Sequence, residues 1–182
     1  MHKVLTALGM LSAGILQAAE MTITVAGQAN GKIVIDLLAE VAPLHVERIS
    51  KLANSGAYDN VVFHRVIDGF MAPTGDGEFG NAEKDLSKAG YGGSSLPDVP
   101  AEFSDIPSDR AIVGMARSQS PDSANSQFFI MFDAGYFLNG QYTVVGRVLS
   151  GMEVVDAIKR GRGSNGAVTG APDVMTTVSV TP

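Results

Sequence analysis

The sequence of 182 residues contains no cysteine and no tryptophan, and only three histidines. Without cysteine the chain can form neither a disulfide nor a thiolate nucleophile, although this absence alone does not identify a compartment. No histidines stand at metal-ligand spacing, which speaks against a zinc site. No Gly-x-Ser-x-Gly stretch is present, and Asp76-Gly-Glu78 falls short of a calcium-binding loop. We therefore expect no zinc site, no calcium-binding loop and no covalent catalysis.

Charge is also scarce, at 18% of residues, and the balance is acidic, with a net charge of −6 and a pI near 4.9. This balance speaks against nucleic acid or an anionic membrane surface as partner. The length suits one domain with a real core. Twenty-one glycines indicate many turns, as in a mainly β fold of short strands. We find no internal repeat and no linker that would divide the chain.

The N-terminus has the layout of a secretory signal peptide. A basic start, Met1-His2-Lys3, precedes an uncharged run at 4–16 and small residues at Ala18 and Ala19. The run is too short to span a bilayer comfortably, and its glycines and alanines fit a buried helix poorly. We expect residues 1–19 to be a signal peptide removed after Ala18 or Ala19, leaving residues 20–182 as the mature domain. Loss of Lys3 changes the net charge from −6 to −7. The prediction is a periplasmic protein with no membrane association after removal.

Hydrophobic periodicity predicts about eight strands and two helices. The clearest strands are 21–26, 32–38, 111–116, 127–132, 143–149 and 174–180. A helix is predicted from Pro43, whose missing N–H costs nothing at the first helical position, up to Gly56. Within it, His45 is predicted to be solvated or half-buried. A capping box at 150–153 predicts a second helix over 152–160. Residues 76–110 have little periodicity, as in a functional loop.

The chain is organised around residues 63–76, which include a hairpin signal at Asp68-Gly69. If both arms are strands, Arg65 shares a face with Phe63. A cation beside large apolar side chains suits a ligand with an apolar body and a polar backbone. The alternative is a core hairpin whose arginine reaches out to water, and this stretch alone favours that alternative. A match to Gly-x-Gly-x-x-Gly at 161–166 follows a helix and opens none, so it indicates a loop and no dinucleotide site.

Six stretches, in the right order and spacing, strongly resemble the cyclophilin-type peptidyl-prolyl isomerases. They are Phe63-His-Arg-Val-Ile-Asp-Gly-Phe-Met71 with Gly75-Asp76, Gly114-Met-Ala-Arg117, Ser123-Ala-Asn-Ser-Gln-Phe-Phe-Ile130, Phe137-Leu-Asn-Gly140, Tyr142-Thr-Val-Val-Gly146 and Gly151-Met-Glu-Val-Val-Asp156. The resemblance covers roughly residues 21–180. It implies a closed eight-stranded antiparallel barrel with a helix over each open end. It also implies that residues 76–110 pack near the active face.

The resemblance implies an enzyme that needs no nucleophile or cofactor. Isomerisation of an X–Pro bond is slow because amide resonance sets a barrier of roughly 18–20 kcal/mol. Tighter binding of the twisted amide than of either planar form lowers that barrier. Arg65 matches the family's catalytic arginine, which can donate to the prolyl nitrogen or the neighbouring carbonyl. The implied pocket for the proline ring and the groove for the flanking peptide comprise Phe70, Met71, Ala116, Gln127, Phe129, Phe137, Leu138 and Tyr142.

Three residues depart from the family's usual pattern. Pro73 stands where a glutamine helps to hold the substrate and the arginine, and this departure puts the catalytic rate in doubt. Tyr142 replaces a histidine but keeps an aromatic wall. Phe137 replaces the tryptophan of some members, which leaves cyclosporin binding open. One hypothesis is a monomeric isomerase that speeds folding of exported, proline-containing polypeptides that are unfolded or partly folded. The alternative, favoured by Pro73 alone, is a proline-peptide binding module or chaperone with weak turnover.

Overall fold

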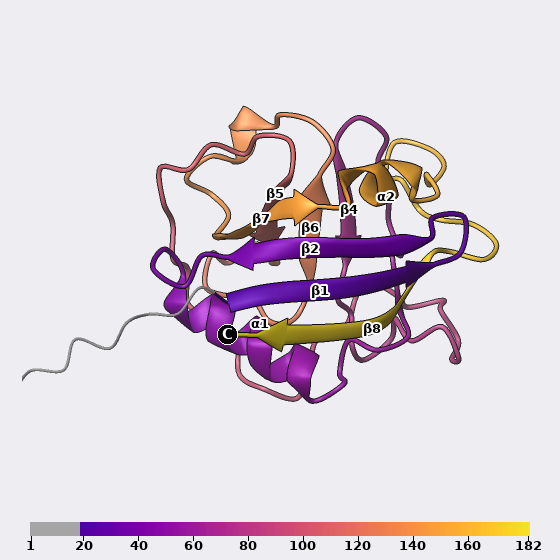
Figure 1. Ribbon diagram of the computed structural model, residues 1–182, viewed down its shortest axis with the longest axis horizontal. Helices are drawn as coiled ribbons and strands as arrows, with labels where there is room; N and C mark the ends of the chain where they lie inside the picture. Colours follow the sequence, from indigo (N-terminus) through magenta and orange to yellow (C-terminus); the bar gives the residue numbers. More distant parts are fainter. Residues whose placement is uncertain (1–18) are drawn as a thin grey trace, which may run out of the picture.

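The computed structural model describes residues 19–182, which form one antiparallel eight-stranded sheet curled into a barrel (Figure 1). The strand order is β3-β8-β1-β2-β7-β5-β6-β4. The elements are β1 (Ala19–Ala26), β2 (Gly31–Leu37), α1 (Pro43–Asn54), β3 (Val61–Val62), β4 (Met71–Thr74), β5 (Ile112–Met115), β6 (Phe128–Met131), the 3-10 helix η1 (Tyr136–Leu138), β7 (Val144–Ser150), α2 (Met152–Ala157) and β8 (Val174–Thr181). The predicted mainly β class with two α-helices is confirmed. The predicted signal peptide lies outside the described residues, except for Ala19.

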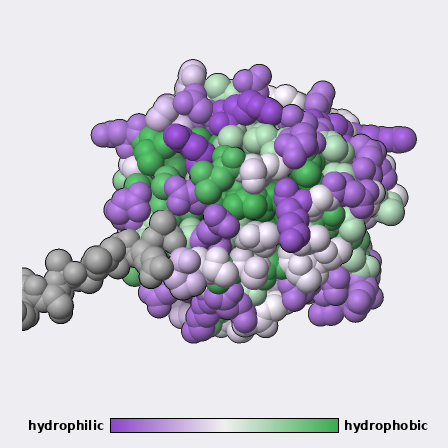
Figure 2. All heavy atoms as spheres, viewed as in Figure 1, coloured by the Kyte–Doolittle hydropathy of each residue, from purple (hydrophilic) through white to green (hydrophobic). Residues whose placement is uncertain are grey.

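The period of two along each strand divides its side chains between two apolar clusters. In β1 and β2, alternate residues point into the barrel, and Ile23 pairs with Ile33 there. In β6, Phe128 and Ile130 belong to this core, whereas Phe129 and Met131 face a second cluster outside the barrel. β4, β5 and β6 are therefore buried on both faces. On the face viewed in Figure 2, a band of apolar surface above β2 is edged by polar side chains.

The barrel is nearly closed, so the expectation of a closed barrel is slightly overstated. β3 and β4 stand at the two ends of the strand order and share no ladder within residues 19–182. Across the gap, the hydroxyl of Thr74 donates to the carbonyl oxygen of Val62 at 2.9 Å. The predicted hairpin is likewise reduced to its turn and a single bridge between Ile67 and Met71. Its two arms are not paired strands.

Pro73 gives a physical reason why the pairing stops at this bridge. Phe132 donates its N–H to the carbonyl of Phe70 at 2.9 Å, so the backbone groups of 70, 72 and 74 point towards β6. The backbone of residues 71 and 73 then points the other way, towards the segment that carries Arg65. The next bond of that ladder would need an N–H from Pro73, and proline has none.

Helix α1 follows its prediction, with Pro43 at its first position and Gly56, at φ +76°, just beyond its end. It packs against β8, whereas α2 packs against β2 on the other side of the barrel (Figure 1). The predicted capping box is wrong. Ser150 is the last residue of β7, and the N-cap of α2 is Gly151, in the left-handed region. The helix also ends at Ala157, three residues earlier than predicted.

The prediction that His45 is solvated or half-buried is wrong as well, because its side chain is fully buried. Glu102, from the long irregular stretch, lies over the start of α1. Its carboxylate accepts from the backbone N–H of His45 at 3.1 Å and contacts the imidazole Nδ1 at 2.7 Å. The two residues are 57 positions apart, so the helical periodicity of residues 43–54 could not predict that Glu102 shields the His45 side chain from solvent.

Candidate active site

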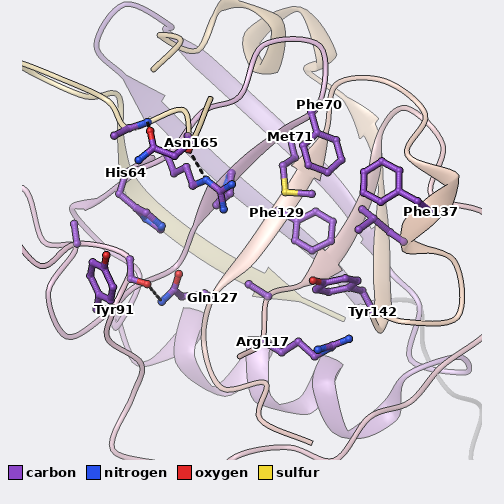
Figure 3. A pocket seen from close by; sticks show the side chains of 17 residues that line it. His64, Phe70, Met71, Tyr91, Arg117, Gln127, Phe129, Phe137, Tyr142 and Asn165 are labelled. Atoms are coloured by element: carbon purple, nitrogen blue, oxygen red, sulfur yellow. Dashed lines mark hydrogen bonds between the residues drawn. The ribbon is translucent and has the colours of Figure 1, made fainter. Parts of the chain in front are cut away.

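A groove with a cavity volume of about 600 Å³ lies over the outer face of β4, β5 and β6 (Figure 3). Its lining includes all nine residues assigned to the site from the sequence: Arg65, Phe70, Met71, Ala116, Gln127, Phe129, Phe137, Leu138 and Tyr142. They come from strands, η1 and connecting segments spread over much of the chain. The structure thus brings the predicted set together at one surface.

The floor of the groove is apolar and buried. Phe129 of β6, Met71 of β4 and Leu138 of η1 are buried and belong to the second apolar cluster. Phe129 needs a glycine beneath it, because a Cβ at Gly114 would lie 2.5 Å from the ring's Cζ. These side chains form a site for a small apolar group whose removal from water stabilises binding.

Two aromatic pairs surround this floor. The rings of Phe70 and Phe137 have centroids 5.3 Å apart, and Phe137 is 68% exposed at the rim. The ring of Tyr142 meets Phe129 edge-on at 5.8 Å. On its other side, the guanidinium of Arg117 lies 4.5 Å from the Tyr142 ring centroid, a cation–π contact. The tyrosine is therefore held between two neighbours at the groove wall.

Gln127 is oriented by a loop that a buried carboxylate holds in place. We call residues 76–93 the Asp76 loop, because the fully buried Asp76 accepts four hydrogen bonds from its backbone. The N–H donors are those of Glu78, Phe79, Gly90 and Gly92, at 3.1, 2.9, 2.7 and 3.0 Å. In turn, the side-chain Nε2 of Gln127 donates to the carbonyls of residues 90 and 92 at 3.1 and 2.7 Å. Its Oε1 remains as an acceptor for a ligand.

Arg65 lies on the polar side of the groove, in the segment between β3 and β4. Its Nε donates to the backbone carbonyl oxygen of Asn165 at 2.5 Å, the contact that Figure 3 marks beside Asn165. Asn165 belongs to residues 161–168, which we call the glycine loop. Within the described part of the chain, no hydrogen bond engages the two Nη groups of Arg65. These groups can therefore donate to a ligand in the groove.

His64 lies beside Arg65 and touches the Asp76 loop, since a Cβ at Gly90 would come within 2.6 Å of its ring. Burial lowers the pKa of the His64 imidazole, against a smaller raising effect of the Asp76 charge. Its buried Nδ1 has no hydrogen-bond partner among residues 19–182. A histidine in this state stays neutral at physiological pH and adds no charge beside the arginine.

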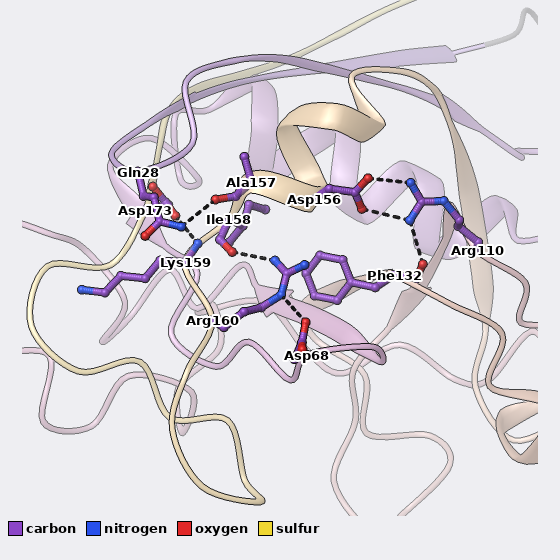
Figure 4. Close-up of polar contacts among 10 residues, drawn as sticks. All are labelled: Gln28, Asp68, Arg110, Phe132, Asp156, Ala157, Ile158, Lys159, Arg160 and Asp173. Atoms are coloured by element: carbon purple, nitrogen blue, oxygen red, sulfur yellow. Dashed lines mark hydrogen bonds and ion pairs between the residues drawn. The ribbon is translucent and has the colours of Figure 1, made fainter.

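The turn at Asp68-Gly69, which precedes Phe70, is held by polar contacts outside the groove (Figure 4). Arg160 donates to the carboxylate of Asp68 at 2.8 Å, and its guanidinium lies 3.9 Å from the ring centroid of Phe132. The pairing with Arg160 lowers the pKa of the exposed Asp68 carboxyl. Beside them, Arg110 makes a two-pronged contact with Asp156 at 2.9 and 2.7 Å.

Sequence reasoning missed several residues of the groove. His64, Tyr91, Arg117 and Asn165 also line it, and Tyr91 is 87% exposed at the rim. His64 and Arg117 stand inside the recognised stretches, whereas Tyr91 and Asn165 stand in loops where no periodicity marks them. Within residues 19–182, no helix is long and apolar enough to cross a bilayer. In the same range, no three His, Cys, Asp or Glu side chains are gathered as a metal site would require.

Comparison with known proteins identifies the family. The family described as cyclophilin type peptidyl-prolyl cis-trans isomerase/CLD matches residues 20–180. A probable peptidyl-prolyl cis-trans isomerase of Brucella suis is 61% identical over 142 residues, covering 76% of this chain and 72% of that protein. A peptidyl-prolyl cis-trans isomerase-like 3 of Dictyostelium discoideum is 35% identical, covering 71% and 77%.

Solved structures share the fold at lower identity. A cyclophilin type isomerase of Cryptosporidium parvum superposes with a TM-score of 0.77 at 22% identity, covering 91% of this chain and 99% of that one. The same protein in the presence of the dipeptide Ala-Pro gives a TM-score of 0.74 at 24% identity, covering 90% and 99%. The chain belongs to the cyclophilin-type peptidyl-prolyl cis-trans isomerase family. It is an enzyme that interconverts the cis and trans forms of X–Pro bonds.

Proposed function

We propose that Arg65 is the catalytic group, and that it stabilises the twisted amide of an X–Pro bond. Twisting the bond removes amide resonance and localises a lone pair on the prolyl nitrogen. A guanidinium fixed by its Nε can donate from its Nη groups to this nitrogen or to the neighbouring carbonyl. Such a preorganised donor stabilises charge that develops only in the transition state. The observation that carries the proposal is the placement of this cation at the edge of a buried apolar floor.

In this proposal the proline ring lies on Met71, Phe129 and Leu138, with Phe137 and Tyr142 at its sides. Gln127 accepts a hydrogen bond from the peptide backbone, and Ala116 lies along the peptide. The crystal structure of the Cryptosporidium protein in the presence of the dipeptide Ala-Pro supports this ligand class. The substrates are unfolded or partly folded proline-containing polypeptides, and the protein acts as a monomer without a cofactor.

A test of the mechanism compares arginine variants in a protease-coupled assay on a proline tetrapeptide. We expect Arg65→Ala to lower kcat/KM by on the order of a hundredfold, the usual scale for one preorganised donor. The melting temperature should be unchanged, since the side chain lines a surface groove. Arg147→Ala, which removes an exposed arginine of β7, is the matched control. Arg65→Ala activity within a few-fold of wild type would show that another group catalyses the reaction.

We further propose that the protein is exported to the periplasm and assists the folding of exported polypeptides there. Support comes from the basic and apolar layout of residues 1–19. In β1, Ala19 pairs with Leu37 at the very end of the ladder, so cleavage on either side of Ala19 spares most of the strand. We expect N-terminal sequencing of the native protein to begin at residue 19 or 20, with the melting temperature nearly unaffected by removal. Retention of Met1 in the native envelope would refute export with cleavage.

The second candidate function is that of a proline-peptide binding module or chaperone with weak turnover, and Pro73 is the observation that favours it. Pro73 lines the groove near Arg65 but offers neither a backbone N–H nor a side-chain donor. If this candidate were correct, proline peptides would bind to the groove in calorimetry while wild-type isomerisation stayed near the uncatalysed rate. The same assay on the wild-type protein therefore separates the two functions.

A further inference from the structure

The glycine loop runs antiparallel to the segment that carries Arg65 and is bonded to it through the backbone. Val66 donates its N–H to the carbonyl of Gly166 at 2.7 Å, and Val168 donates to the carbonyl of His64 at 3.2 Å. These two bonds flank Arg65 on both sides along the chain. The side-chain bond from its Nε to the carbonyl of residue 165 adds a third contact to the same loop.

Among residues 19–182, no comparable restraint acts on Arg65 from the opposite side of this segment. Its neighbour there is β4, and the bridge between Ile67 and Met71 is the last backbone pairing that the segment makes with that strand in the described part of the chain. The next position is Pro73, which has no N–H to donate and whose side chain has no polar atom. The orientation of the arginine is therefore controlled from the glycine-loop side.

The loop presents its carbonyl to Arg65 through a tight, locally bonded turn. The side-chain Oδ1 of Asn165 accepts from the N–H of Ala167 at 3.2 Å, and Gly166 donates to the carbonyl of Gly163 at 3.2 Å. Gly166 has a φ of +66°, a left-handed conformation that favours glycine. A Cβ there would also lie 2.6 Å from Cγ1 of Ile67 and 2.8 Å from a backbone oxygen. Glycine is thus required for the loop to lie this close.

We propose that the glycine loop is the positioning element of Arg65, through the carbonyl of Asn165, and that it substitutes for the restraint that Pro73 cannot supply. The loop fixes the guanidinium plane so that both Nη groups face the reacting amide. This inference rests on the proposed catalytic role of Arg65. The loop itself touches no reacting atom, so its residues position the catalyst and do not perform the chemistry.

The first test displaces the loop with Gly166→Ala. We expect kcat to fall by roughly tenfold or more, because small misplacements of a catalytic group are costly, while KM for the proline tetrapeptide changes less than twofold. Gly170→Ala is the matched control. It carries the same backbone strain, at φ +73°, but its Cβ meets only the flexible end of Lys159 at 3.4 Å. Its kcat should match the wild type. Equal losses in both variants, or a loss confined to KM, would overturn the proposal.

The second test asks whether the loop and residue 73 act on the same group. Pro73→Gln supplies an N–H and an amide on the opposite side of Arg65, so it should restore most of the kcat lost in Gly166→Ala. If Gly166→Ala lowered kcat equally in the wild-type and the Pro73→Gln backgrounds, the result would contradict the proposal. In an Arg65→Ala background, Gly166→Ala should not lower kcat any further. If Arg65→Ala left kcat unchanged, the proposed catalytic role of Arg65 would be wrong. If Arg65→Ala lowered kcat but Gly166→Ala did not, only the positioning role of the glycine loop would be wrong.

A measurement on the wild-type chain keeps the proposal testable even if Gly166→Ala does not fold. The Nε–H proton of Arg65, assigned by its loss in Arg65→Lys, should give one resolved NMR resonance whose exchange with water is slower than that of Arg147. Exchange as fast as that of the exposed Arg147 would overturn the proposal.

Discussion

Two loops flank the groove, and each orients one polar side chain by a different physical means. The Asp76 loop is fixed by a fully buried carboxylate that accepts four backbone N–H groups. The glycine loop is fixed by backbone bonds to the neighbouring segment and contacts Arg65 at an exposed position. Hydrogen bonds to a buried charge are strong and costly to leave unmade, whereas exposed ones contribute little to stability. Damage to the Asp76 loop should therefore destabilise the fold, and damage to the glycine loop should lower the catalytic rate.

The largest effect is expected from Asp76→Asn, which breaks the first loop. An amide keeps the shape of the side chain, but its NH₂ group would face backbone donors that have lost their acceptor. We expect the free energy of unfolding to fall by about 1–3 kcal/mol, the cost of leaving a buried polar group unsatisfied. KM should rise as Gln127 loses its orientation. Urea denaturation and steady-state kinetics measure the two effects.

Asp85→Asn is the matched control for this variant. Asp85 belongs to the same loop, and its exposed carboxylate accepts from the N–H and hydroxyl of Ser87. Its denaturation midpoint and KM should both stay close to the wild type. If Asp76→Asn behaved like this control, the buried carboxylate would not be what holds the Asp76 loop.

A smaller effect, on rate alone, is expected from Pro73→Gln on the other side of the groove. The glutamine offers Arg65 and the substrate a hydrogen bond to a charged or developing-charge group, which is worth about 1.5–3 kcal/mol. We expect kcat/KM to rise at least severalfold with little change in melting temperature. Pro73→Ala, which restores the N–H without the amide, separates the backbone contribution from that of the side chain. An unchanged or lower rate in Pro73→Gln would make this position a neutral variant.

The smallest effect is expected on the pH dependence of stability, and it involves His64, which contacts both loops. Burial places its folded-state pKa below the ordinary value of 6.5. Above pH 6.5 the imidazole is neutral in both states and contributes no pH dependence. As pH falls below 6.5, the unfolded chain takes up a proton that the folded chain resists, so stability declines.

Denaturation midpoints between pH 7 and 5 test this directly. His64→Asn should flatten the decline of stability in that window relative to the wild type, and equal slopes would count against the buried neutral imidazole. The kcat/KM of the wild type should stay flat between about pH 6 and 8, because no group that titrates there takes part in the reaction. A bell-shaped profile would instead point to a titrating catalytic group.

Elements whose signal is local could be predicted from the sequence alone. Alternation marked β1 and β2, and Pro43 and Gly56 marked the ends of α1 within two residues. The resemblance to a known family brought nine residues into one predicted site, and the structure places all nine around one groove. Burial of β6 on both faces is consistent with the continuous apolar run of phenylalanine, isoleucine and methionine that predicts this strand.

The contacts that hold those residues in place depend on how distant segments pack together. Glu102 contacts His45, which is 57 positions away in the sequence. The backbone carbonyl of Asn165 accepts a hydrogen bond from Arg65, which is 100 positions away. Backbone carbonyls and N–H groups are present at nearly every residue, so no sequence pattern says which of them a side chain will reach. The backbone hydrogen bond that Pro73 cannot make and the four N–H groups that bind Asp76 depend likewise on the direction in which each backbone group points. That direction is determined when distant segments pack together.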